Sequence, residues 1–102
     1  MDSYRIVELD VIRWSEARGI LPNSTPQAQL IKMVSEVGEL ADAIGKKNRE
    51  ATIDGLGDVW VCMVNIAALL DLDLVDCFNS AYNEIKDRKG YMNKEGLFIK
   101  EQ

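Results

Sequence analysis

Acidic side chains recur at helical spacing in two neighbouring apolar segments of the chain. In the segment SEVGELADA, Glu36, Glu39 and Asp42 follow one another at three-residue steps, so a helix would carry them along one face. In the next segment, DGLGDVWVCMV, Asp54 and Asp58 lie four residues apart and also share a helical face. Carboxylates that meet repel one another and are costly to bury without compensation. Two such faces packed together therefore predict a hard divalent cation between them, because Mg²⁺ and Mn²⁺ prefer carboxylate and water oxygens.

The expected metal ligands are Glu36, Glu39, Asp54 and Asp58, with Mg²⁺ as the expected cation and Mn²⁺ as the alternative. The simpler interpretation is that these acids face solvent. Two acidic pairs on adjacent helices, each among apolar residues, favour the cation site over that interpretation.

The composition excludes several other classes of site. Histidine is absent, which excludes histidine-based triads and the Glu-x-x-His di-iron pattern. Cys62 and Cys77 lie in apolar surroundings without Cys-x-x-Cys spacing, which predicts buried structural thiols. The net charge of −5 argues against a nucleic-acid partner. The first ten residues show no signal peptide and the uncharged run 59–70 is too short to span a bilayer, so we expect a cytoplasmic protein with no membrane partner.

Basic side chains gather near the end of the last predicted helix, at Lys86, Arg88 and Lys89. Their simplest explanation is compensation of the helix dipole or a solvated face. Beside a cation site they suggest a second role, because arginine and lysine side chains together with Mg²⁺ bind polyphosphates. Lys32, one turn before Glu36, is expected to contact the same ligand.

Four helices are predicted, over residues 4–18, 26–44, 49–70 and 73–89. Gly19 and Gly90 are placed as stops, and Thr25 followed by Pro26 is an N-cap and first-turn pair. The segment ILPNSTPQ before the second helix is predicted as a linker, and the tail 90–102 as a small hairpin or an extended tail. Asn65, the one polar residue of the run 59–70, is expected on a functional or hydrogen-bonded seam. The expected fold is a single all-α domain over residues 1–102, similar to a four-helix bundle.

These motifs resemble the MazG-type nucleoside triphosphate pyrophosphohydrolases, especially their compact single-domain forms. The resemblance is carried by WSEARGI, IKMVSEVGEL, DGLGDVWVCMV, NEIKDRKG and GLFIKE, in that order along nearly the whole chain. It implies an all-α fold in which a Glu-Glu-x-x-Glu motif and a Glu-x-x-Asp motif bind Mg²⁺. It also implies hydrolysis of a nucleoside triphosphate, here expected to be a deoxynucleotide, to the monophosphate and pyrophosphate.

The resemblance assigns roles position by position. Glu36 and Glu39 match the second and third glutamates of the first motif and are the expected catalytic residues, while Asp58 matches the final aspartate of the second motif. Lys32 matches the basic residue that usually precedes the first motif. The late pattern that contacts phosphates and sugar in the family is matched by Asn83, Arg88 and Lys89.

Two positions depart from the family pattern. Ser35 stands where the first glutamate is usual, and Gly55 where the glutamate of Glu-x-x-Asp is usual. Asp54, one residue earlier and on the face of Asp58, is the expected substitute for the second of these. The departures imply fewer metal ions, or water activation by metal and Glu36 alone.

The alternative function is a nucleotide-binding or oligomerising helical module whose catalysis is lost. A homodimer or homotetramer is expected, since four helices in a small chain leave apolar flanks exposed. Trp14 and Trp60 are interpreted as core residues in preference to base-stacking ones. Gly57 is expected to allow a neighbouring helix to approach closely.

Overall fold

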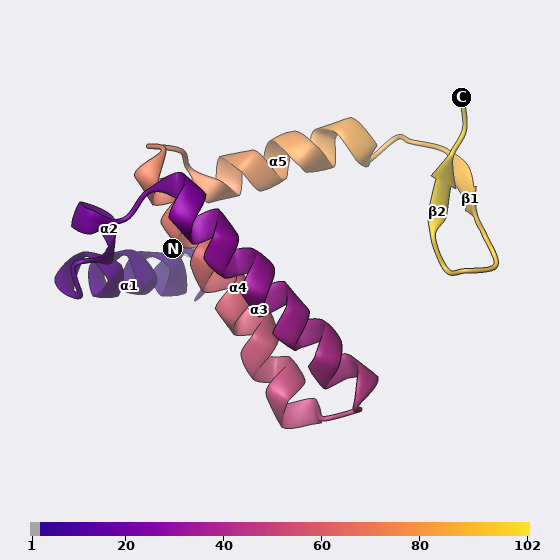
Figure 1. Ribbon diagram of the computed structural model, residues 1–102. Helices are drawn as coiled ribbons and strands as arrows, with labels where there is room; N and C mark the ends of the chain where they lie inside the picture. Colours follow the sequence, from indigo (N-terminus) through magenta and orange to yellow (C-terminus); the bar gives the residue numbers. More distant parts are fainter. Residues whose placement is uncertain (1–2) are drawn as a thin grey trace.

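The computed structural model describes residues 3–102, which form five helices and one small hairpin (Figure 1). The elements follow in the order α1 (Ser3–Ala17), α2 (Ile20–Asn23), α3 (Pro26–Gly45), α4 (Arg49–Leu69), α5 (Leu74–Ile85), β1 (Gly90–Met92) and β2 (Phe98–Lys100). The predicted all-α class is confirmed, and so is the hairpin at the end of the chain.

Helices α3 and α4 form an antiparallel pair that is the largest packed unit of the described chain. Each begins at a capped residue. The hydroxyl of Thr25 accepts a hydrogen bond from the Ala28 amide at 3.1 Å, with Pro26 as the first helical residue. The side chain of Asn48 accepts from the Ala51 amide, also at 3.1 Å. These caps satisfy amides that lack helical partners. Only residues 46–48 separate the end of α3 from the start of α4.

The close approach of α3 and α4 occurs at Gly55, which is buried in α4. A β-carbon there would lie 3.2 Å from Leu40 Cδ1 and 3.3 Å from Leu40 Cα, a spacing tighter than ordinary van der Waals contact. A β-carbon on Gly57, by contrast, would meet no neighbouring element within 4 Å. The expectation that Gly57 admits the neighbouring helix is therefore wrong, because the rotation of α4 turns Gly55 toward α3 instead.

Helix α1 crosses α4 and completes the small core. Gly19, at a φ of 82°, ends the region of α1, as predicted. The segment expected to be a linker contains the short helix α2, in which the Ser24 amide donates to the Ile20 carbonyl at 2.7 Å. A single turn of helix is too short to leave a periodic sequence pattern. The buried core comprises Val64, Ala67 and Leu74, and the half-buried residues packed on it are Val11, Ile12, Trp60 and Met63.

The C-terminal arm, defined as residues 74–100, begins in the core at Leu74 and then projects away from the other helices (Figure 1). Asp73 caps α5 by accepting from the Val75 amide at 2.9 Å and the Asp76 amide at 3.3 Å. Helix α5 ends at Ile85, four residues before the predicted end. The amide of Glu101 donates to the Lys89 carbonyl at 2.8 Å. Residues 86–89, which the sequence pattern assigned to the helix, therefore form the connection to the hairpin instead. Gly90 begins β1 rather than ending a helix.

The hairpin pairs β1 with β2 in antiparallel register, with Tyr91 opposite Ile99. A β-carbon on Gly90 would collide with the carbonyl oxygen of Ile99. Glycine is therefore required where the two strands meet closely.

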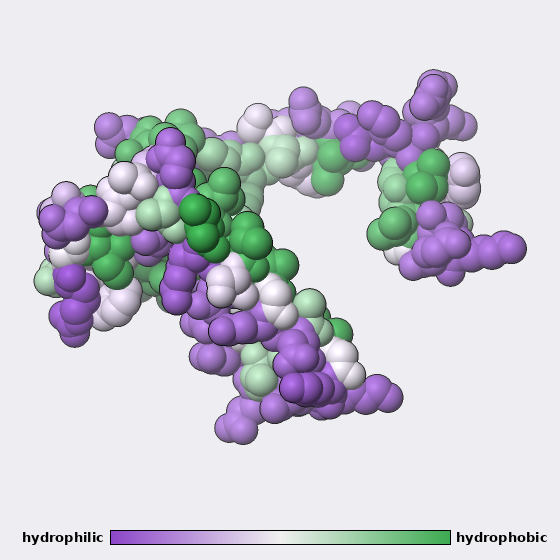
Figure 2. All heavy atoms as spheres, viewed as in Figure 1, coloured by the Kyte–Doolittle hydropathy of each residue, from purple (hydrophilic) through white to green (hydrophobic). Residues whose placement is uncertain are grey.

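The single chain is extended, with a radius of gyration of 16.1 Å against about 13 Å for a compact domain of this size. Over the described part of the chain, α5 packs against α4 and not against α3. Large apolar side chains are consequently exposed on α3, α5 and the hairpin (Figure 2). They include Ile31, Val34, Phe78, Tyr82, Ile85, Tyr91, Leu97 and Phe98. Exposure on this scale fits a chain that associates with other copies.

Among the described helices, α4 is long and apolar enough to cross a membrane by the measures of length and composition alone. The central helix of a water-soluble domain meets the same measures, and α4 packs along α3 and carries Asp54 and Asp58.

Candidate active site

The acidic residues predicted as metal ligands lie around the middle of the α3–α4 pair. Glu36 is buried on α3, and Asp58 is half-buried on α4. Burial raises the pKa of the Asp58 carboxyl, and the charges of Asp54 and Glu36 raise it further. The charge of Glu36, followed by a hydrogen bond with it, also raises the pKa of Glu39 on the exposed side of α3. The structure therefore brings the carboxylates of both helices close enough to repel one another.

Lys32 compensates part of this negative charge. Its Nζ lies 3.1 Å from Glu36 Oε1, and this hydrogen bond raises the pKa of the lysine. The pair is spaced i, i+4 on α3, with Lys32 exposed and Glu36 nearly enclosed. The lysine can therefore swing from Glu36 toward an anionic ligand in solvent, which leaves the carboxylate free for a cation.

Asp54 lies beside Asp58 on the side of α4 that faces α1. Both line an apolar pocket of about 370 Å³ between these helices, together with Glu8. The charge of Asp54, and a hydrogen bond between the two carboxyls, raise the pKa of Asp58. Asp54 therefore interacts with Asp58, although the side chain of Asp54 is exposed.

These carboxylates fit a hard divalent cation by their chemistry. All the donors are oxygen, and the raised pKa values of Glu39 and Asp58 express a repulsion that a cation would relieve. Within residues 3–102, no three acidic or thiol side chains already form a closed metal-binding group. Binding would therefore require side-chain rotation, which the exposed Glu39 and Asp54 permit.

A second pocket, of about 300 Å³, opens from the acidic residues toward α1 and α2. It is lined by Trp14, Ile20, Gln29, Lys32, Glu36, Asp58, Val61, Cys62 and Asn65. The predicted hydrogen-bonded position of Asn65 is confirmed, because its Oδ1 accepts from Ser15 Oγ at 2.6 Å and its Nδ2 donates to Gln29 Oε1 at 3.2 Å. Gln29 Nε2 donates in turn to Ser24 Oγ at 3.0 Å.

Sequence reasoning missed Ser15, Ile20 and Gln29 as residues of this site. Gln29 carried one usable signal, since it lies three residues before Lys32 and shares its helical face. Ser15 and Ile20 carried none, because their place depends on how α1 and α2 pack beside α4. Trp14, expected in the core, is 47% exposed at the pocket, so that expectation is wrong.

The two cysteines differ in environment. Cys62 is buried, as predicted, and burial raises its pKa, with the charge of Glu36 adding to the effect. Cys77 is exposed, which corrects the prediction of a buried thiol. Helix α5 turns this residue to solvent where the arm leaves the other helices.

Comparison with known proteins agrees with this geometry. Residues 24–92 match the model of the MazG nucleotide pyrophosphohydrolase domain. The chain belongs to the MazG family. The matched region contains α3, α4, α5 and β1, and therefore all four predicted metal ligands.

Two proteins of phages are similar to the chain. An uncharacterised 18.2 kDa protein from the rep–hol intergenic region of Haemophilus phage HP1 (strain HP1c1) is 36% identical over 66 residues, which are 65% of this chain and 40% of that protein. The chain thus spans less than half the length of this curated relative. A MazG-like pyrophosphohydrolase of cyanophage S-2L, solved with dGDP and three catalytic Mn²⁺ ions per active site, has a TM-score of 0.75 and 17% identity over 99% of this chain and 95% of that chain. At this identity the likeness shows the fold alone.

The two departures from the MazG pattern have different structural settings. Ser35 is exposed on α3. Gly55 is buried, and a β-carbon there would point at Leu40 rather than at the acidic residues. Asp54 adds a carboxylate beside Asp58, and its role as the substitute ligand stays a prediction.

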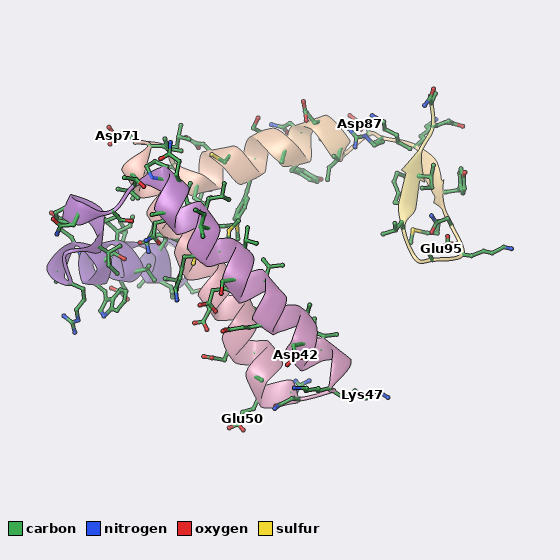
Figure 3. The ribbon with its side chains drawn as sticks, in the orientation of Figure 1. Asp42, Lys47, Glu50, Asp71, Asp87 and Glu95 are labelled. Atoms are coloured by element: carbon green, nitrogen blue, oxygen red, sulfur yellow. The ribbon has the colours of Figure 1, made fainter. Side chains whose placement is uncertain are left out.

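The predicted substrate-binding residues of the arm lie away from the acidic residues of the same chain. Asn83 is near the end of α5, while Lys86, Arg88 and Lys89 follow it, and all four are exposed. Figure 3 shows Asp87, their neighbour, at the far end of α5 close to the hairpin, and Asp42 on the lower part of α3. Within one chain the structure brings Lys32 to the acidic group, but not these four residues.

Proposed function

We propose that this MazG-family chain hydrolyses nucleoside triphosphates, with deoxynucleotides as the expected substrates, to a nucleoside monophosphate and pyrophosphate. The observation that carries the proposal is the group formed by Glu36, Glu39 and Asp58 with Lys32, where mutually repelling carboxylates stand beside a mobile cation. Such a group suits a triphosphate that arrives with a divalent cation. The cyanophage relative, bound to dGDP and Mn²⁺, supports the same assignment.

Glu36, Glu39, Asp58 and the neighbouring Asp54 would hold the cation, Mg²⁺ or Mn²⁺. When bound, the cation supplies charge neutralisation for the phosphates and activation of water. In the reaction a water oxygen forms a bond to the α-phosphorus, the bond from that phosphorus to the bridging oxygen breaks, and pyrophosphate leaves. Lys32, released from Glu36, neutralises charge that develops on the phosphates.

A homodimer or homotetramer would complete the site. The arm projects from its own chain, carries Asn83, Lys86, Arg88 and Lys89, and exposes an apolar face. Docked on a second copy, it would bury that face and place these side chains near the copy's carboxylates. The proposed arrangement explains why one chain has both halves of a phosphate site but does not bring them together.

Complementation between two inactive variants tests this arrangement. Glu39→Ala removes a carboxylate from α3, and Arg88→Ala removes a cation from the arm. Each variant alone is expected to be inactive, and a mixture refolded together is expected to regain part of the activity, because mixed oligomers contain one intact composite site. A mixture that stays inactive while still oligomeric would contradict the role of the arm in the partner's site.

The activity itself is tested with a panel of deoxynucleoside and ribonucleoside triphosphates, each with Mg²⁺ or Mn²⁺. We expect release of monophosphate and pyrophosphate by the full chain, and a fall to the level without enzyme for Glu39→Ala. Glu50→Ala is the matched control, since Glu50 is an exposed acid at the far end of α4 (Figure 3). Absence of turnover on every nucleotide with both metals would refute the proposal.

The second candidate is a module that binds nucleotides without hydrolysing them. This candidate is favoured by Gly55, which supplies no carboxylate at a usual ligand position and leaves little room for one, because Leu40 lies against the space that a side chain would enter. Nucleotide with metal would then raise the melting temperature by mass action, with no product formed. Product formation in the same samples would exclude this candidate.

A further inference from the structure

The pocket that opens from the acidic residues has two chemically different ends. On α3, Glu36 lies seven residues after Gln29, and on α4, Asn65 lies seven residues after Asp58. Because the helices are antiparallel, the two carboxylates form one end and the two amides the other. Seven residues of helix separate the ends by about 10 Å. A ligand that fills the pocket must therefore be anionic or metal-bound at one end and offer hydrogen-bonding groups at the other.

The amide end also has apolar walls. Trp14 from α1 and Ile20 from α2 line the pocket with Gln29 and Asn65, and the Arg18 guanidinium lies 5.9 Å from the centre of the Trp14 ring. An aromatic ring kept half-exposed beside the buried amide of Asn65 and the half-buried amide of Gln29 is a combination with which proteins bind flat heterocycles. A nucleobase presents both a flat apolar face and a hydrogen-bonding edge.

A chain of hydrogen bonds fixes the orientation of the amides. Ser15, with 0% exposure, donates to Asn65 Oδ1, so the nitrogen of Asn65 faces Gln29. The nitrogen of Gln29 then faces Ser24. Each side-chain amide nitrogen carries two hydrogens and uses one of them in this chain. One N–H of Asn65 and one of Gln29 are thus left for a ligand, in directions set by Ser15 and Ser24.

We propose that Gln29 and Asn65 bind the edge of the substrate's nucleobase, with Trp14 and Ile20 as apolar walls and Ser15 as a positioning residue. This inference rests on the proposed function, because it takes the triphosphate to lie at the end of Glu36, Asp58 and Lys32. It assigns selection among nucleotides to the amide end and binding of the phosphates to the acidic end. Base binding and phosphate binding can be separated by comparing a nucleotide with a ligand that carries the phosphates alone.

Binding is measured by calorimetry on the full chain with Mn²⁺, using α,β-imido nucleoside triphosphates with each of the four bases and inorganic tripolyphosphate. Gln29→Ala is expected to weaken nucleotide binding about tenfold, as loss of a hydrogen bond in a pocket does, and to leave tripolyphosphate binding unchanged. Gln27→Ala is the matched control, because Gln27 is an exposed glutamine of the same helical turn. This variant should bind both ligands as the wild type does. Trp14→Ala should show the same split as Gln29→Ala.

Ser15→Ala tests the positioning role. Its expected signature is a changed order of affinity among the four bases with unchanged tripolyphosphate binding, whereas a merely structural role would leave the order intact. If Gln29→Ala and Trp14→Ala leave nucleotide binding unchanged, or weaken tripolyphosphate binding equally, the inference is overturned while the proposed function stands. Wild-type protein that binds neither ligand would overturn the proposed function as well.

Discussion

Replacing Gly55 by alanine is expected to destabilise the α3–α4 pair, whereas the same change at Gly57 is expected to stabilise it. Both glycines lie in the interior of α4, two residues apart. A β-carbon at Gly55 would lie 3.2–3.3 Å from three atoms of Leu40, including its backbone Cα, while the space at Gly57 is open. The two variants therefore share their effect on helix propensity and differ in their packing against α3.

The magnitudes follow from these two effects. Alanine is favoured over glycine inside a helix by about 1 kcal/mol, which is the expected increase in stability for Gly57→Ala. Crowding of a packed interior by an added methyl group costs about 1–3 kcal/mol. Since the propensity effect is common to both, Gly55→Ala should be less stable than Gly57→Ala by about 1–3 kcal/mol, and each 1 kcal/mol corresponds to about 4–8 °C in Tm for a domain near this size.

The assay is urea denaturation followed by helical circular dichroism, with both variants and the wild type at one protein concentration. Equal stabilisation by Gly55→Ala and Gly57→Ala would refute the argument that Leu40 occupies the space beside residue 55. Gly55→Glu, which restores the carboxylate usual in the MazG family, should suffer the same crowding. A glycine at position 55 thus both removes the usual carboxylate and allows α3 to pack closely on α4.

Three further outcomes are expected. The Asp73 carboxyl is desolvated, which by itself raises its pKa, but hydrogen bonds from Arg5 and from two backbone amides lower the pKa overall. A carboxyl whose pKa is lowered in the folded state contributes stability at pH values above its unfolded-state pKa, and this contribution is lost as the pH falls through its folded-state pKa. Asp73→Asn should therefore lower Tm at neutral pH and lose its effect in acid. Iodoacetamide should label Cys77 in the native protein and Cys62 only after unfolding, as mass spectrometry would show, because Cys62 is buried with a raised pKa; rapid native labelling of both would contradict this. Thr25→Ala should cost about 1 kcal/mol in urea denaturation through loss of the cap on α3, and an unchanged midpoint would argue against the cap.

The sequence predicted those features that depend on local pattern. The start of α3 follows from Thr25 and Pro26, and the meeting of acidic faces at Glu36 and Asp58 follows from helical periodicity and a short connection. The polar position of Asn65 was visible because an isolated polar residue in an apolar helix needs a partner.

The remaining features depend on tertiary packing. Which glycine faces α3 is set by the rotation of α4, so Gly55 and Gly57 could not be told apart from their spacing. The end of α5 at Ile85 is set by the hairpin that follows, not by helix propensity. The exposure of Trp14 and Cys77 reflects where α1 and α5 lie relative to α4, which no pattern within those segments specifies.

The dominance of the α3–α4 pair has a consequence for folding. These helices are joined by residues 46–48 and provide most of the packing between elements in the described chain, so their contacts are local in sequence and close with little loss of chain entropy. The pair can form before α1 crosses it. Its carboxylates would then repel one another from the first structured stage, so the acidic group opposes the formation of the pair as well as the stability of the finished fold.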